Sequence, residues 1–171
     1  MTADVFSNVP GVYINEIAVG DITSFEGVGN DPATQAEIVV TAPPTIAKEF
    51  VPPVIAPGES ATLRITIGND NDAAGSLTSD LVDTLPATPA VMVVAATPNI
   101  TSSCPGGTGI VSATAGGTTV TINNGAGTPP GGCVVTVDVT APSNGDYLNN
   151  IPVGALQTTL GPNEVPTEAP L

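Results

Sequence analysis

The feature that most constrains the fold is an internal repeat that relates the two ends of the chain. Residues 1–37 align without a gap with residues 135–171. The identical positions are Thr2, Asp4, Val5, Gly11, Tyr13, Asn15, Ile17, Val19, Gly20, Gly27 and Pro32, matched by Thr136, Asp138, Val139, Gly145, Tyr147, Asn149, Ile151, Val153, Gly154, Gly161 and Pro166. Self-similarity at so long a spacing indicates a whole domain that recurs along the chain.

The phase of this repeat predicts how the chain is divided. Residues 1–41 are expected to be the end of a preceding repeat or an N-terminal donor-strand extension, and residues 42–44 a Pro-rich joint. Because Pro fixes its own φ and restricts the residue before it, the joint should be stiff. Residues 45–171 are expected to form a sandwich. Leu171 aligns with Glu37, just before the apolar run 38–40, so this sandwich is predicted to lack its last strand.

Short alternating segments predict that the domain is built from β-strands. Over 60–68, Leu63, Ile65 and Ile67 occupy one face and polar residues the other, which is the pattern of a half-buried strand. Further strands are expected at 45–50, 77–85, 91–95, 110–115, 118–123, 134–140, 146–153 and 155–160. With 18 Pro, 19 Gly and no long helical periodicity, the chain is predicted to be all-β, an Ig-like antiparallel β-sandwich with Greek-key connections.

The charge balance excludes several classes of function. The chain has 2 basic and 16 acidic residues, no His, and a net charge of −14. Nucleic acid is not expected as a partner, because phosphate binding needs a basic patch. Without His the usual general base is missing, so no catalytic residue is assigned and no enzyme activity is expected. No run of 18 apolar residues is present, so membrane insertion is not expected either. Residues 1–5 do not resemble a signal peptide.

The two cysteines, Cys104 and Cys133, each adjoin a Gly-Pro cluster. Two thiols without His make a poor metal site, so no metal is assigned to them, and a disulfide fits better. A disulfide indicates an oxidising compartment. Closing a loop of about 30 residues should stabilise the fold by roughly 3–4 kcal/mol in the chain-entropy account. Two free buried thiols are the alternative.

Several segments together resemble the Ig-like tandem repeats of bacterial surface proteins. The similar stretches are 44–50, 55–63, 80–86, 131–137 and 147–156, the third with Leu81 where the family has an aromatic residue. The resemblance covers about 38–163 as one repeat and 1–41 as the end of another. It implies an extracellular β-sandwich module with a Cys104–Cys133 bridge and no enzyme activity.

The predicted gap at the end of the sandwich suggests how units assemble. An incomplete sheet exposes unpaired backbone groups that another strand can cover. The expected donor strand, which would complete the adjacent sandwich, consists of Gln35, Ala36, Glu37, Ile38, Val39, Val40 and Thr41. Strand addition of this kind, repeated head to tail, produces a filament, with copies of the chain as its partners.

Two alternatives accompany this prediction of an extracellular structural filament or surface fibre. The chain could be one window of a long tandem polypeptide, which would also explain why the whole of 1–34 is duplicated. The chain could instead be a repeat of an adhesin stalk or of a carbohydrate-binding protein. A cluster of exposed aromatic residues would favour that second alternative, but the five aromatic residues form no obvious cluster in the sequence.

The sequence offers two candidate ligand or modification sites. Asp70, Asp72, Asp80 and Asp83 supply the hard oxygen ligands that Ca²⁺ prefers, although the glycine and distal Glu of an EF-hand are missing. A solvated turn is the simpler interpretation, and no other cofactor is expected. Asn99 begins an Asn-Ile-Thr triplet and is a candidate glycosylation acceptor.

Lys48 is the only lysine of the chain. On the first strand of a surface sandwich, a lysine could be cross-linked to an asparagine beside a buried carboxylate. Candidate partners are Asn15, Asn149 and Asn150, and candidate acids are Glu49 and Asp138. The simpler interpretation is an exposed lysine that protects a sheet edge.

Overall fold

The computed structural model describes residues 4–171, and the matches at Met1 and Thr2 lie outside the described residues. The chain forms two compact units, Met1–Ala42 and Pro43–Leu171. In the first unit, strand β1 (Gly11–Ile17) pairs antiparallel with β2 (Thr34–Val40) over seven residues each. Over residues 4–42, the strands of this unit form one two-stranded hairpin.

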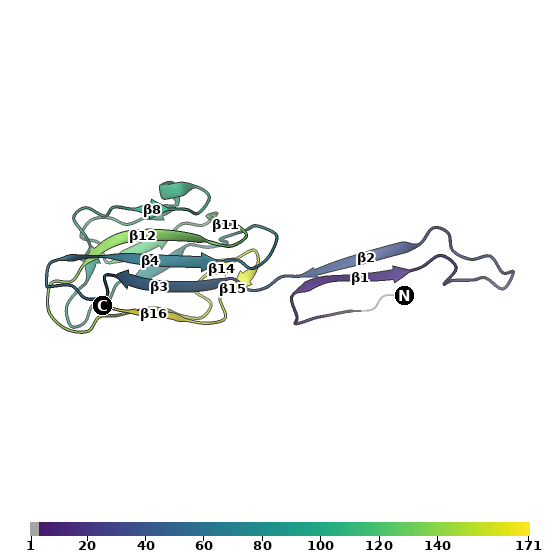
Figure 1. Ribbon diagram of the computed structural model, residues 1–171, viewed down its shortest axis with the longest axis horizontal. Coiled ribbons are helices and arrows are strands. Elements are labelled where there is room, and N and C mark those ends of the chain that lie inside the picture. The colour runs from purple at the N-terminus through teal and green to yellow at the C-terminus, as the bar shows by residue number, and fades with distance from the viewer. Residues whose placement is uncertain (1–3) are drawn as a thin grey trace. The chain divides into compact units, whose positions relative to one another are not determined.

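The second unit is organised around one large antiparallel sheet (Figure 1). Its strand order is β3 (Thr45–Val51), β4 (Ser60–Gly68), β12 (Cys133–Thr140) and β7 (Val93–Val94). Strand β8 (Thr101–Ser102) also pairs with β12. The alternation recognised in 60–68 continues in β12, where every second residue from Cys133 to Val139 is buried.

Smaller sheets complete the unit. They pair β6 (Leu81–Thr84) with β10 (Thr119–Ile122) and β10 with β9 (Val111–Ser112), β5 (Gly75–Ser76) with β11 (Gly127–Thr128), β13 (Leu148–Ile151) with β16 (Thr167–Pro170), and β14 (Gln157–Thr158) with β15 (Gly161–Pro162). One 3₁₀ turn, η1, spans Gly107–Ile110. The all-β prediction is confirmed, while Ig-like Greek-key connectivity stays a prediction.

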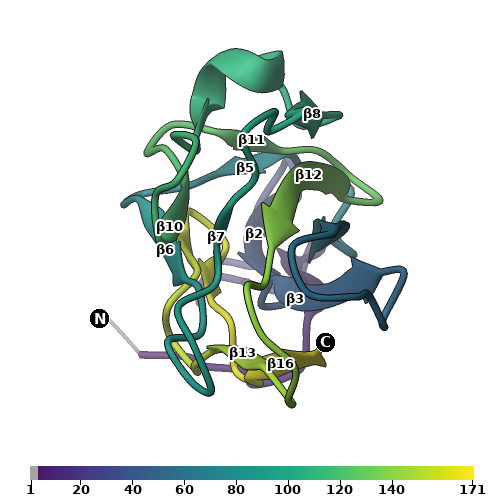
Figure 2. The same ribbon diagram turned by 90° about the vertical axis from the view of Figure 1, so that its left-hand side faces the viewer.

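The core of the second unit lies between these layers. Figure 2 shows β3 and β12 on one side, β6 and β10 on the other, and β13 and β16 below them. The buried side chains are mostly aliphatic, as the low aromatic content predicts; the largest fully buried ones are Leu63, Ile65, Ile67, Leu77, Leu81, Met92, Ile122, Ile151 and Leu156. This arrangement of facing sheets around one apolar core is a β-sandwich.

The edge that was expected to be empty is occupied by β16. It pairs with β13 in a register that places Asn149 opposite Ala169, and Leu171 exchanges two backbone hydrogen bonds with Tyr147, at 2.9 and 3.0 Å. This corrects the expectation that residues 45–171 lack their last strand. The expectation failed because it took the corresponding strand to begin near residue 38, whereas β2 begins at Thr34, whose counterpart in register is Thr167.

Candidate functional site

Three polar side chains from three strands meet inside the sandwich. On β3 the buried positions are Ile46, Lys48 and Phe50, so the strand alternation directs Lys48 into the core. Its side chain has no exposed surface, and the interpretation of Lys48 as an exposed edge lysine is therefore wrong. On β13 the same alternation buries Asn149, and with it Ile151, while Asn150 is exposed.

The carboxylate of this cluster comes from Asp83 on β6. Asp83 follows buried Leu81 and precedes buried Leu85 on the same face, and its side chain is fully covered. Lys48 Nζ donates a hydrogen bond of 2.9 Å to Asp83 Oδ1. Asn149 Nδ2 donates one of 3.0 Å to Asp83 Oδ2. One carboxyl group thus holds the amine and the amide on either side of itself.

Burial makes the charged forms of this pair costly. Desolvation raises the pKa of Asp83 above its ordinary value, although the Coulombic attraction of Lys48 opposes the shift. Desolvation likewise lowers the pKa of Lys48 despite the attraction of Asp83. Both shifts favour a neutral pair, in which the carboxyl group carries the proton and the amine has a free lone pair.

The amide of Asn149 is only half satisfied. Among residues 4–171, Asn149 Oδ1 is buried and has no hydrogen-bond partner. A buried acceptor without a donor costs about 1–3 kcal/mol. If the amide turned about its Cβ–Cγ bond, Oδ1 would face Asp83, and a protonated carboxyl group could donate to it. The unsatisfied oxygen and the neutral acid therefore complement each other.

The structure separates the four residues of the calcium prediction. Asp83 faces the core, whereas Asp80 Oδ1 accepts a 2.7 Å hydrogen bond from the backbone of Asn124. Asp70 and Asp72 are exposed. Within residues 4–171, no group of three or more His, Cys, Asp or Glu side chains could hold a metal ion. The prediction of a site shared by these four residues is wrong, because alternation turns Asp83 away from the loop.

Asn99 lies in an exposed loop, and its backbone adopts a positive φ of 44°. Its Nδ2, the atom that an N-linked sugar would modify, donates a 2.7 Å hydrogen bond to Asp138 Oδ2. Asp138 also accepts from Thr62 at 2.7 Å and is not part of the Lys48 cluster. Glycosylation of Asn99 stays a prediction.

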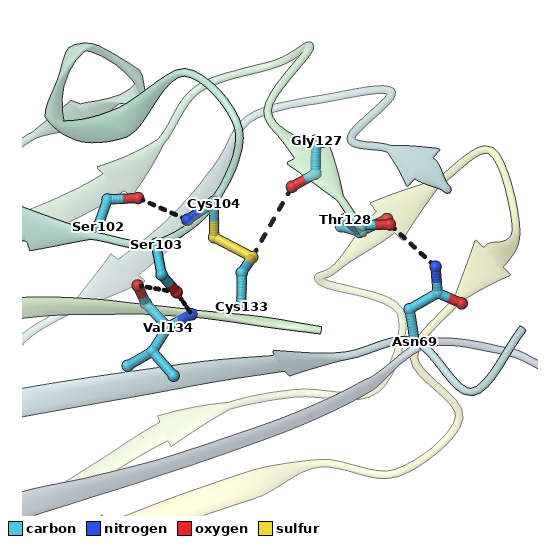
Figure 3. The surroundings of a disulfide bond; sticks show 8 residues. All are labelled: Asn69, Ser102, Ser103, Cys104, Gly127, Thr128, Cys133 and Val134. Carbon is cyan, nitrogen blue, oxygen red and sulfur yellow. Dashed lines mark hydrogen bonds between the residues drawn. A yellow bond between two sulfur atoms is a disulfide. The ribbon is translucent and has the colours of Figure 1, made fainter. Parts of the chain in front are cut away.

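The two cysteines form a disulfide, with Cα atoms 4.9 Å apart (Figure 3). It joins the segment after β8 to the start of β12. Beside it, Ser103 N and Val134 O form a 2.9 Å hydrogen bond, and Val134 N donates to Ser103 Oγ at 2.8 Å. A structural disulfide of this kind is typical of an oxidising compartment.

The β1–β2 hairpin repeats the β13–β16 hairpin in its strand register. Tyr13 pairs with Ile38 as Tyr147 pairs with Leu171. The predicted donor strand 35–41 thus lies mostly in β2, where it pairs with β1 of its own unit. Its role in a neighbouring sandwich stays a prediction.

The connections of the two hairpins use the same side-chain hydrogen bonds. Asn30 Oδ1 accepts from Ile22 N, and Asn30 Nδ2 donates to Ala18 O, both at 2.9 Å. Asn163 makes the equivalent bonds with Leu156 N and Pro152 O, at 2.9 and 3.0 Å. Since Asn30 and Asn163 match only after a one-residue shift, the gapless alignment did not reveal this signal.

The tyrosines also match. Tyr13 donates its hydroxyl proton to Val9 O at 2.9 Å, and Tyr147 donates to Ser143 O at 3.0 Å, in each case four residues back. A hydroxyl hydrogen bond to the backbone a few residues upstream is the geometry of a corner tyrosine. Tyr147 is 2% exposed, but Tyr13 is 39% exposed.

Sequence reasoning placed Lys48 and Asn149 among the cross-link candidates but missed the acid. Glu49 is exposed and pairs with Arg64 at 3.1 Å, and Asp138 lies elsewhere, so both proposed acids are wrong. The missed signal was the alternation Leu81, Asp83, Leu85, which puts a carboxyl group on an apolar face.

Comparison with known proteins identifies a family and a likeness to a solved structure. Residues 44–171 match a family model described as a domain of unknown function, DUF7933. No curated protein matches the chain. The crystal structure of BslA, described as a bacterial hydrophobin, is similar with a TM-score of 0.45 and 15% identity, over 77% of this chain and 93% of that one.

In the part of the chain that the structure describes, no helix is long and apolar enough to cross a membrane.

Proposed function

This chain belongs to the DUF7933 family of domains of unknown function, and we propose that it is a structural module of an extracellular surface fibre. In this fibre, sandwich units follow one another in a line, and the β1–β2 hairpin completes an adjacent sandwich body. The body is of the same family. It is supplied by the preceding repeat of one polypeptide, or by another copy of the chain in which β1–β2 takes the place of that copy's own β13–β16.

The observation that carries the proposal is the difference in burial between two equivalent hairpins. Leu156 is fully buried, whereas its counterpart Ile22 is 58% exposed. The same contrast holds for Tyr147 and Tyr13. An isolated two-stranded hairpin is marginally stable at best in water. The apolar face of β1–β2 is therefore shaped for the kind of surface that covers β13–β16.

The outer faces of the two hairpins show that the difference in burial is confined to one face. Ile14 is 59% exposed and its counterpart Leu148 is 56% exposed, so this position faces water in both hairpins. Only the face with Tyr13 and Ile22 changes its environment. The disulfide supports an extracellular setting, where it would persist.

A longer chain, with a copy of residues 43–137 placed before residues 4–171, tests the proposal. This junction keeps the phase of the repeat and provides the missing body. We expect backbone amides of 11–17 and 34–40 to exchange with D₂O much more slowly in the longer chain than in the 171-residue chain. Ile22→Asp should abolish that protection, and Ile14→Asp, on the outer face, should not. Equal exchange in both chains would contradict the proposal.

Sedimentation of the 171-residue chain distinguishes a body supplied by another copy from one supplied by a preceding repeat. Concentration-dependent, end-to-end polymers that Ile22→Asp dissolves would indicate separate copies joined head to tail. A monomer at high concentration would indicate that the body belongs to the same polypeptide.

A further inference from the structure

We propose that Lys48 and Asn149 become joined by an amide bond between Lys48 Nζ and Asn149 Cγ, formed inside the folded sandwich with Asp83 as the proton carrier. The bond would link β3, near the start of the sandwich unit, to β13, near its end. It goes beyond the proposed function, because it concerns one sandwich and requires no neighbour.

The geometry supplies the reacting groups. Asp83 holds the amine at 2.9 Å and the amide at 3.0 Å through its two oxygens. All three residues are buried, so water cannot compete as a nucleophile at Cγ. Positioning of reacting groups in a fixed, dry site is a main source of rate acceleration.

The protonation states suit an attack by the amine. A lysine amine is nucleophilic only when neutral, and burial lowers the pKa of Lys48. The proton then resides on Asp83, whose pKa burial raises. With the Asn149 amide turned about its Cβ–Cγ bond, the protonated carboxyl group can donate to Oδ1, which in the structure is buried and has no partner among the described residues. This hydrogen bond would stabilise the negative charge that develops on Oδ1.

The reaction balances without any co-reactant. The Nζ lone pair attacks Cγ, and the C=O electrons move to Oδ1 under the hydrogen bond from Asp83. The Asp83 carboxyl group then carries a proton from Nζ to Nδ2. The Cγ–Nδ2 bond breaks as the carbonyl re-forms, and ammonia leaves. One C–N bond forms, one breaks, and no atom changes oxidation state.

The sequence allows a direct test, because Lys48 and Arg64 are the only trypsin sites. The probe is the purified 171-residue chain, denatured and reduced, then digested with trypsin and analysed by mass spectrometry. Without the bond, the products are 1–48, 49–64 and 65–171. With the bond, Lys48 is not cleaved, and 1–64 remains attached to 65–171. The intact mass is then lower than the sequence mass by one ammonia.

The digest distinguishes the proposed bond from other losses of ammonia. Succinimide formation at Asn124–Gly125 or Asn144–Gly145 also releases ammonia, but it leaves Lys48 cleavable. We expect Asn149→Ala to give the three separate fragments, and Asn150→Ala, at the exposed neighbouring position, to retain the joined product. Three separate fragments from the unsubstituted chain would overturn the proposal.

The role of Asp83 is tested separately. Asp83→Asn keeps the shape of the side chain but cannot carry protons, so we expect the joined product to disappear while the circular dichroism spectrum stays that of a β-protein. A folded Asp83→Asn chain that still forms the bond would overturn the role of Asp83. If this variant does not fold, Asp83→Glu, which retains a carboxyl group, should restore the joined product; a folded Asp83→Glu chain without it would contradict the assignment.

Discussion

The hairpins β1–β2 and β13–β16 share a strand register, the asparagine hydrogen bonds of their connections and a tyrosine hydrogen bond, yet only the second has a buried face. Their internal structure is therefore determined by local sequence. Their stability is not determined in this way, because an uncovered hairpin buries little of its apolar surface. In the second hairpin the sandwich body of its own unit covers the apolar face. Under the proposed function, a neighbouring body does the same for the first hairpin.

The residues of the polar cluster come from both parts of the sandwich unit, the body and the hairpin β13–β16. The body supplies Lys48 and Asp83, and the hairpin supplies Asn149. In the first hairpin the equivalent Asn15 is exposed. If a body of the same family covers β1–β2, Asn15 would meet the counterpart of the Lys48–Asp83 pair. In the longer chain described above, a second cross-link, to Asn15, is then expected.

The largest expected effect comes from removing the lysine of the buried pair. Lys48→Met leaves Asp83 buried without its partner and should destabilise the sandwich by about 3–5 kcal/mol at neutral pH. The folded state retains the proton of Asp83 at pH values where the unfolded chain has lost it, because burial raises the pKa of this carboxyl group. Stability should therefore fall as pH rises from the ordinary carboxyl range through this raised pKa. Urea unfolding between pH 4 and pH 8 measures the trend.

The control for this prediction is the exposed ion pair of Arg64 and Glu49. Arg64→Met should change stability little and add no comparable pH dependence, because exposed pairs contribute about 0–1 kcal/mol. If Lys48→Met showed a stability that rose with pH, the assigned direction of the Asp83 shift would be wrong.

The second prediction tests the burial contrast directly. Leu156→Ala should destabilise the sandwich by about 2–5 kcal/mol, since it removes a fully buried side chain. Ile22→Ala, at the equivalent exposed position, should stay within about 0.5 kcal/mol. Both values come from urea unfolding at one pH. In the longer chain, Ile22→Ala should lower the free energy of unfolding nearly as much as Leu156→Ala does. If Ile22→Ala had no effect there either, the two hairpins would not be equivalent.

The third prediction concerns the tyrosine hydroxyl groups. Tyr147→Phe removes a buried hydrogen bond to Ser143 O and should cost about 1 kcal/mol. Tyr13→Phe removes the equivalent bond from a partly exposed ring, where water replaces it, and should have a smaller effect. Thermal unfolding of the two variants at equal concentration measures the difference. Equal costs would mean that the hydroxyl contribution does not depend on burial.

Alternation predicted the strands of the main sheet well. The segment expected at 60–68 is β4 itself, and the one at 134–140 differs from β12 by one residue, because regular period-2 burial is visible in the sequence. β16 was missed because Thr167–Pro170 is short and ends in Pro, which is unusual in a strand. Its identity depends on pairing with β13, a contact that the local sequence does not encode.

The polar cluster was only partly predictable for a related reason. Lys48 and Asn149 occupy core-facing positions of recognisable strands, so their burial could be expected. Asp83 was grouped with the acidic residues nearby as a possible calcium ligand, although the strand expected over 77–85 includes it. Which three strands bring their polar residues together is a property of the sheet packing, and no spacing along the chain specifies it.

The smallest expected effect tests whether burial alone distinguishes the hairpins. Asn150 Nδ2 donates to Glu168 Oε1 at 3.0 Å, and Gln35 Nε2 donates to Glu16 Oε2 at 2.9 Å, across equivalent strand positions with the two residue types exchanged. Both pairs face water, so Asn150→Ala and Gln35→Ala should each cost no more than about 0.5 kcal/mol. The effect of Asn150→Ala is measured by urea unfolding. The effect of Gln35→Ala is measured by hydrogen exchange of the backbone amides of 11–17 and 34–40. A cost well above this for Asn150→Ala alone would mean that the outer face of β13–β16 also contributes to docking, and the exposed face of β1–β2 would then need a partner on both sides.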